Sequence, residues 1–171
     1  MAIKSVVKLG NKQLANPSLP VEHFKSAELF ELIQDMLDTM KEKGGVGIAA
    51  PQIGHNRRVI IFGFEKNERY PNEKPVPFTI LINPIIEILS DEMVDGWEGC
   101  LSVPGLRGLV PRYQKIRYSG FDAEGNPISQ VAEGFHARVV QHECDHIDGI
   151  LFPQRIKDMR FFGFEEEIFA K

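Results

Sequence analysis

Hydrophobic positions follow a helical period in two parts of the chain. Between residues 26 and 43 apolar residues recur every three or four positions, which predicts an amphipathic helix that Ser26 caps and Gly44-Gly45 ends. A second helical period runs from about residue 135 to residue 150. A short Phe-rich segment, residues 161–170, closes the chain and predicts a short terminal helix.

Other hydrophobic segments are short, rich in Ile, Val and Phe, and bounded by turn residues. They predict strands at residues 57–65, 79–89, 115–122 and 127–133. The polar segment 66–77 predicts an exposed loop, and Glu124-Gly125-Asn126 predicts the turn of a β-hairpin. Because the strands come first and a long helix comes late, the order favours an α+β fold over alternating βαβ units.

Length and composition narrow the class of protein. A chain of 171 residues with 43% apolar and 26% charged residues predicts a single globular domain over residues 1–171. The net charge of −4 argues against a nucleic-acid partner. The apolar runs are too short to span a membrane, and no targeting segment is visible, so we expect a cytoplasmic protein. Two cysteines do not make a disulfide framework.

The sequence His142-Glu143-Cys144-Asp145-His146 lies inside the second predicted helix. Residues four apart on a helix face the same way, so the two histidines can hold one cation with Glu143 beside them. The alternative is that both histidines belong to an ordinary hydrophobic core. Two imidazoles and a carboxylate on an apolar face are, however, costly to bury without a partner. The spacing therefore favours a metal site.

The third ligand separates the candidate classes of metal enzyme. Phe152 stands where one class of metalloprotease carries a third histidine, which argues against that class. Glu165, Glu166 and Glu167 are weak candidates because they lie in an exposed terminal segment. Cys100, in a Gly- and Pro-bounded segment, is the better candidate and would complete a Cys/His/His site with one open position. For Cys144, one position away from the His142 face, we expect core packing.

Three segments occur in the order of a known set of motifs. They read Gly45-Val46-Gly47-Ile48-Ala49-Ala50-Pro51-Gln52, Glu98-Gly99-Cys100-Leu101-Ser102 and Gln141-His142-Glu143-Cys144-Asp145-His146. These segments resemble the three signature motifs of peptide deformylase, and the similarity extends from about residue 6 to residue 152.

The resemblance implies a fold, a reaction and a metal. The fold would have antiparallel β-sheets surrounding a central helix that carries the HExxH motif. The reaction would remove the formyl group from the N-terminal methionine of new polypeptides. Cys100, His142 and His146 would hold ferrous iron, although this donor set alone also suits zinc, nickel or cobalt.

The resemblance also implies roles for residues around the metal. Glu143 would take a proton from water, and the Leu101 backbone N–H and the Gln52 amide would stabilise the oxyanion. The substrate backbone would pair with the edges around Val46, Gly47 and Gly99, while the methionine side chain enters an apolar pocket.

Two arginines and an acidic segment bear on the resemblance. We expect Arg112, where the family carries an arginine, to offset Asp145 near the helix. Arg138 departs from the pattern, because deformylases commonly carry an apolar residue there, near the methionine pocket. Residues 165–167 are acidic, unlike the basic terminal helix that docks some family members on the ribosome, so the resemblance implies at most a transient ribosome contact.

Two rival functions remain for the same residues. The first is another metallohydrolase, such as a peptidase or an amidase acting on a different acyl group. The second is a non-catalytic module in which the metal is a structural staple. A staple would need a fourth protein ligand, and the sequence offers no clear one.

Overall fold

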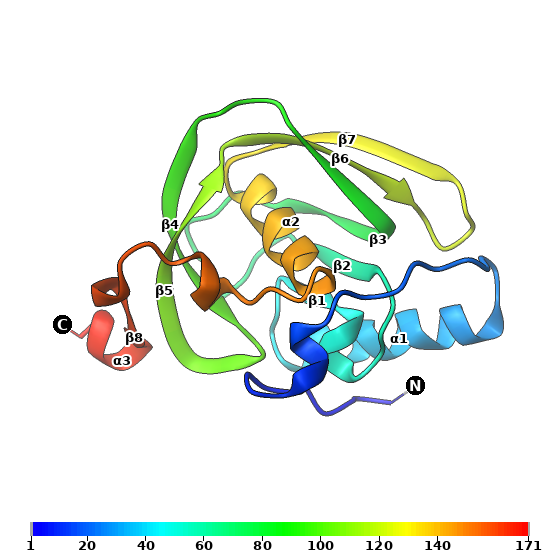
Figure 1. The fold of residues 1–171 in the computed structure, drawn as a ribbon, viewed down its shortest axis with the longest axis horizontal. Helices are drawn as coiled ribbons and strands as arrows, with labels where there is room; N and C mark the ends of the chain where they lie inside the picture. The colour runs from blue at the N-terminus through cyan, green and yellow to red at the C-terminus, as the bar shows by residue number, and fades with distance from the viewer. Residues whose placement is uncertain (1, 171) are drawn as a thin grey trace.

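Two antiparallel β-sheets and three α-helices make up the fold in the computed structural model, which describes residues 2–170 (Figure 1). The larger sheet has the order β1-β2-β3-β6-β7, and the smaller has the order β4-β5-β8. The larger sheet contains β1 Gly47–Ala49, β2 Val59–Phe64, β3 Val76–Ile88, β6 Lys115–Phe121 and β7 Pro127–Glu133. The smaller contains β4 Met93–Cys100, β5 Val103–Tyr113 and β8 Phe162–Phe164. The expected α+β class with antiparallel sheets is confirmed.

The helices are α1 Ala27–Glu42, α2 Gly134–Ile147 and the short terminal helix α3 Glu165–Ile168. Four 3-10 turns complete the regular structure at Lys12–Ala15, Ala50–Ile53, Phe152–Arg155 and Met159–Phe161. Within residues 2–170, no helix has both the length and the hydrophobicity that a membrane crossing needs.

The helix α1 begins and ends as its sequence predicts. The Ser26 hydroxyl accepts a hydrogen bond from the Leu29 N–H at 3.2 Å, which satisfies one of the free N–H groups of the first turn. At the other end Gly44 adopts a left-handed φ of 61°, which a residue without a side chain takes at little cost.

Strand β2 is buried on both faces, which explains its continuous apolar run. Val59 and Ile61 face one way and pack in the cluster that contains the apolar side of α1. Ile60 and Phe62 face the other way and pack in the cluster that contains the apolar side of α2. The larger sheet is therefore covered by a helix on each face at its β1–β2 end.

The hairpin β6–β7 is confirmed, with Phe121 opposite Pro127 in the register. Other predicted boundaries are wrong by a few residues. Strand β3 begins at Val76, inside the expected loop, because the chain shifts register at a bulge after Phe62 and Phe64 then pairs with Val76.

Helix α2 ends three residues before the expected residue 150. Gly149 adopts a left-handed φ of 77°, and the Ile150 N–H donates back to the Asp145 carbonyl at 2.9 Å. These two features close the helix at Ile147.

Strands β4 and β5 were not expected from the hydrophobic pattern, yet they carry one side of the candidate site. They pair from Met93 opposite Tyr113 to Cys100 opposite Val103, with an irregularity between Glu98 and Cys100. Helix α2 contacts β5 as well as several strands of the larger sheet. His142 and His146 on this helix lie beside Glu98 and Cys100 at the end of β4.

Candidate metal centre and active site

Three side chains from two elements meet at one point. His142 and His146 lie one turn apart on α2, with ring centroids 5.1 Å apart. Cys100 is the last residue of β4, and its Sγ lies 3.3 Å from His146 Nε2. The ligand atoms of all three residues lie within 4.8 Å of one another, so the structure brings together the three predicted metal ligands.

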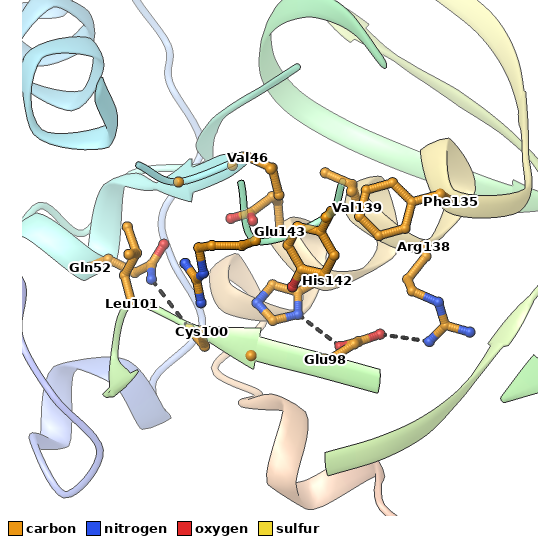
Figure 2. Close-up of a pocket in the computed structure, with 15 residues that line it drawn as sticks. Val46, Gln52, Glu98, Cys100, Leu101, Phe135, Arg138, Val139, His142 and Glu143 are labelled. Carbon is orange, nitrogen blue, oxygen red and sulfur yellow. Dashed lines mark hydrogen bonds and ion pairs between the residues drawn. The ribbon is translucent and has the colours of Figure 1, made fainter. Parts of the chain in front are cut away.

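Glu98 orients the first of these histidines. Its Oε2 lies 2.8 Å from His142 Nδ1, which leaves His142 Nε2 to face the shared point (Figure 2). Arg112 binds both oxygens of the same carboxylate, from Nε at 2.9 Å and from Nη2 at 3.0 Å. Burial alone would raise the pKa of Glu98, but Arg112 and His142 hold it well below its usual range. Glu98 is therefore a carboxylate with several donors around it.

Arg138 does not point its charge into the pocket. Its Nη1 donates to Glu98 Oε1 at 2.9 Å and to the Val110 carbonyl at 2.7 Å, and its Nη2 donates to the Val94 carbonyl. A Cβ at Gly96 would lie 2.6 Å from the guanidinium carbon, so the absent side chain leaves the space that Arg138 occupies. Arg138 lines the pocket with its guanidinium turned toward Glu98 (Figure 2).

Arg112 also forms an ion pair with a second buried acid. Its Nη1 donates to Asp145 Oδ2 at 2.6 Å, which confirms the expected pairing of Arg112 with Asp145. Arg155 binds the other oxygen of Asp145 at 2.7 Å. The buried acids Glu98 and Asp145 thus share one arginine.

Glu143 is buried beside the three predicted ligands, and its environment suits a base. Its Oε2 has no hydrogen-bond partner within the described residues. Burial raises the pKa of Glu143 to about 7. A Cβ at Gly47 would lie 2.7 Å from the Glu143 carboxyl carbon, so β1 can approach this acid only because residue 47 has no side chain.

Gln52 is held with its amide toward Cys100. Its Oε1 accepts from the Ala49 N–H at 2.8 Å, which fixes the side chain. Its Nε2 donates to Ser102 Oγ at 3.1 Å and contacts Cys100 Sγ at 3.5 Å (Figure 2). Leu101, which follows Cys100 directly, is half-buried in the wall of the same pocket.

Eight of the nine predicted site residues line this one pocket. They are Val46, Gly47, Gln52, Gly99, Cys100, Leu101, His142 and Glu143. The ninth, His146, is 1% exposed and lies behind the lining with its Nε2 beside the sulfur. The rest of the lining includes Tyr70, Phe135 and Val139.

The pocket lies between two strands that each have a free edge. Strand β1, with Gly47, is at the edge of the larger sheet, and β4, with Gly99, is at the edge of the smaller. Both residues line the pocket. An extended peptide laid between them could form main-chain hydrogen bonds with an unpaired strand edge.

Comparison with known proteins identifies the family. The family model described as polypeptide deformylase matches residues 3–161. The chain belongs to this family. Members of the polypeptide deformylase family remove the N-terminal formyl group from nascent peptides in a metal-dependent hydrolysis, so the protein is a hydrolase of N-terminal processing in protein biosynthesis.

Individual relatives are similar to this chain over nearly its whole length. The chain is 58% identical to peptide deformylase 2 of Ralstonia nicotianae, over 99% of this chain and 96% of that protein. It is 59% identical to peptide deformylase 1 of Bordetella pertussis, with the same coverage. A crystal structure of a class I type b peptide deformylase from Acinetobacter baumannii superimposes with a TM-score of 0.88 at 41% identity and covers 92% of this chain and all of its own.

The residues present fit the divalent metal that deformylases need. Ligands of one tetrahedral ion, bound through sulfur and an imidazole nitrogen, are roughly 3.5 Å apart, and Cys100 Sγ and His146 Nε2 lie 3.3 Å apart. Cys144 does not join them. It is 7% exposed within the core cluster of the larger sheet, which confirms its expected role in packing.

Two residues of the deformylase site were missed as site residues. Glu98 was noted only as part of a motif, and Arg138 only as a departure from the pattern. Glu98 could have been found from its place two residues before Cys100, since a ligating histidine usually pairs its second nitrogen with a carboxylate or a carbonyl. The role of Arg138 depends on its hydrogen bonds to carbonyls of β4 and β5, and the local sequence does not reveal these acceptors.

Proposed function

We propose that this protein removes the formyl group from N-terminal formyl-methionine by means of one divalent metal ion bound to Cys100, His142 and His146. The observation that carries the proposal is the convergence of these three ligand atoms beside the buried, unpartnered carboxylate oxygen of Glu143. The cluster contains three ligands among the described residues, whereas a structural zinc site has four. Three ligands favour a catalytic ion over a staple.

The proposed ion is ferrous iron, on the strength of the family resemblance. One thiolate and two imidazoles also suit zinc, nickel and cobalt, so the purified protein can contain any of them. When bound, the ion supplies Lewis-acid chemistry, which makes a water molecule more acidic and polarises the formyl carbonyl.

Glu143 is the proposed general base and acid. A carboxyl with a pKa of about 7 can take a proton from water and later return it, since its two protonation states are close in free energy at neutral pH. The proton would go to Glu143 as the water oxygen attacks the formyl carbon. Glu143 would then protonate the departing amine, and formate would leave.

Gln52 and Leu101 are the proposed donors to the oxyanion. The bond from the Ala49 N–H to Gln52 Oε1 fixes the amide, so Nε2 is already directed toward the reacting region before the substrate binds. A donor that needs no reorientation lowers the barrier more than a mobile one. The Leu101 backbone N–H is the second proposed donor, because it follows the ligand Cys100 directly.

The substrate would lie between β1 and β4. Its backbone would pair with the strand edges at Val46, Gly47 and Gly99, and the methionine side chain would contact Phe135 and Val139. A peptide deformylase structure from Acinetobacter baumannii, 41% identical to this chain, is described as bound to Met-Ala-Ser. That tripeptide is the kind of product this reaction would release.

We propose that residues 1–171 form a single domain with the HExxH helix α2 at its centre. The contacts of α2 with β5 and with strands of the larger sheet support this arrangement. Because the substrate is a nascent polypeptide, we propose that the protein acts in the cytoplasm and meets the ribosome only transiently.

The test combines metal analysis with a formate assay on one sample. The protein is purified without oxygen, its metals are quantified, and formate release from formyl-Met-Ala-Ser is measured. We expect about one equivalent of ferrous iron and formate release that a chelator abolishes and restored iron recovers. An active protein without a metal, or a metal-loaded protein that releases no formate, would contradict the proposal.

A further inference from the structure

A groove leads away from the metal centre along one face of the molecule. It has a volume of about 710 Å³ and shares Arg69, Cys100 and Leu101 with the pocket described above. Its other walls come from the N-terminal segment around residues 3–8, from the end of α1 and from residues 103–107. The groove therefore adjoins the pocket at these three residues, beside one of the predicted metal ligands.

Positive charge gathers in the groove although the chain as a whole is acidic. The charged residues that line it are Lys4, Lys8, Lys43, Arg69, Arg107 and Glu165. Five of these six are cationic, whereas the net charge of the chain is −4. The groove therefore carries a net positive charge, whereas the net charge of the whole chain is negative.

Two of the five cations already have an acidic partner. Lys4 Nζ lies 3.1 Å from Asp35, and Arg107 Nη2 lies 3.0 Å from Glu165. Lys8, Lys43 and Arg69 form no ion pair with any acid in the described part of the chain. Their charges are available to a ligand.

The three available cations come from separate segments that the fold ties to the site. The Lys8 segment is held on both sides, because the Val7 N–H donates to the Gln52 carbonyl at 2.9 Å and the Leu9 N–H donates to the Ser102 carbonyl at 2.8 Å. Lys43 follows the last residue of α1 directly and caps that end of the helix. Arg69 belongs to the loop whose Tyr70 hydroxyl accepts from Arg107 at 3.1 Å.

We propose that this groove binds the segment of the substrate that follows formyl-methionine and that it favours acidic residues in that segment. The inference rests on the proposed function. The formyl group must reach the metal centre and the methionine side chain must enter the apolar pocket, so the rest of the peptide leaves along an open path. A carboxylate on that path meets Lys8, Lys43 and Arg69, and no unpaired acid lines it.

A peptide fits these observations better than a nucleic acid does. The groove adjoins the pocket at Cys100 and Leu101, so the chain of a substrate bound in the pocket would extend toward it. Three available cations suit a few carboxylates, whereas a phosphate backbone is bound by longer basic surfaces, and the acidic chain repels it overall.

The first experiment compares three formylated peptides on the metal-loaded protein. They are formyl-Met-Ala-Ser-Ala-Ala, formyl-Met-Ala-Ser-Glu-Glu and formyl-Met-Ala-Ser-Lys-Lys, each amidated at the C-terminus. At low ionic strength we expect kcat/KM for the Glu-Glu peptide to exceed that for the Lys-Lys peptide about tenfold, with the neutral peptide between them. At about 0.5 M salt the ratio should fall toward one, because exposed charges are then screened.

The second experiment moves the charge. In the Lys8→Glu/Lys43→Glu protein the ratio of the Glu-Glu to the Lys-Lys peptide should fall to about one or below. The Lys12→Glu/Lys157→Glu protein carries the same change of net charge at exposed positions outside the groove, and it should keep the ratio of the parent protein. Inhibition by the deformylated peptides gives the same ranking without depending on the chemical step.

Three outcomes would overturn the inference. Equal kcat/KM for the three peptides at low salt is the first, and an equal fall of the ratio in both double variants is the second. The third is inhibition of the parent protein by a short single-stranded RNA that disappears only in the Lys8→Glu/Lys43→Glu protein. That result would show that the cations bind nucleic acid. Failure of the proposed function is distinct from these, because then the neutral peptide releases no formate at all.

Discussion

The helices α1 and α2 are similar in length but bury different chemistry. Along α1 the buried side chains are mainly apolar, with Leu29, Leu32, Ile33, Met36 and Met40 against the larger sheet. Along α2 they include Arg138, Gln141, Glu143, Asp145 and His146. The apolar side chains of α1 contribute favourably wherever water is excluded, because the hydrophobic effect has no directional requirement.

The difference shows that α2 depends on partners that α1 does not need. A buried polar group is costly unless it is hydrogen-bonded, and a buried charge is costlier still. Glu98 supplies much of what α2 needs, since His142 and Arg138 both bind it. The four predictions below test this contrast, beginning with the largest effect.

Glu98→Gln should have the largest effect because it leaves two buried arginines without their shared counter-charge. Breaking a buried ion pair costs about 3–5 kcal/mol in the free energy of unfolding, which urea titration measures. The matched control is Glu87→Gln, which removes an exposed pair with Arg117 and should change stability by less than about 0.5 kcal/mol. Equal stability of the two variants would contradict the role given to Glu98.

Glu143→Gln should reduce kcat by at least about a hundredfold while the bound metal stays near one equivalent. An amide keeps the shape of the carboxyl but does not accept the proton from water. The measurements are formate release and metal content on the same sample. Glu133→Gln, on an exposed glutamate just before α2, should keep full activity. A fully active Glu143→Gln protein would remove Glu143 from the mechanism.

Arg138→Met should weaken metal binding about tenfold, because the Glu98 carboxylate that orients His142 loses one of its donors. Competition with a chelator measures the affinity. Arg117→Met, at an exposed arginine of β6, serves as the control and should leave the affinity unchanged. If Arg138→Met lowers stability alone, Arg138 stabilises the fold without positioning the site.

Ile61→Val should have the smallest effect. Ile61 is fully buried on the α1 side of the larger sheet, and loss of one methylene costs about 1 kcal/mol. We expect thermal unfolding to shift by a few degrees while kcat and metal affinity stay at their parent values. A change in metal affinity in this variant would show that the two sides of the sheet are coupled.

The parts of the fold that follow from burial alone could be predicted from the sequence. The apolar period of α1, its Ser26 cap and the β6–β7 hairpin are local features, and the structure confirms them. The strands β4 and β5 could not be predicted in this way. Gly96, Pro104 and Pro111 interrupt their apolar pattern, and the buried charged residues Glu98 and Arg112 interrupt it further.

The residues of the candidate site likewise fall into those that the sequence could predict and those that it could not. The HExxH spacing places both histidines on one face of a helix, which is a local property, so the pair could be predicted. Cys100 could be chosen as the third ligand from its Gly- and Pro-bounded segment and from the resemblance of the motifs, but its role as a ligand stays a prediction. The support given by Arg138 could not be predicted, because its acceptors are carbonyls of strands that the pattern did not reveal.

The glycines beside the site carry a consequence for how freely the protein can vary. A methyl group at Gly47, Gly96 or Gly99 would intrude on Glu143, Arg138 or Arg107, respectively. The room for these long side chains is thus provided by neighbours that have none. Alanine at any of these three positions would force the long side chain beside it to shift, so a library that diversifies small residues near a catalytic centre would disturb these contacts.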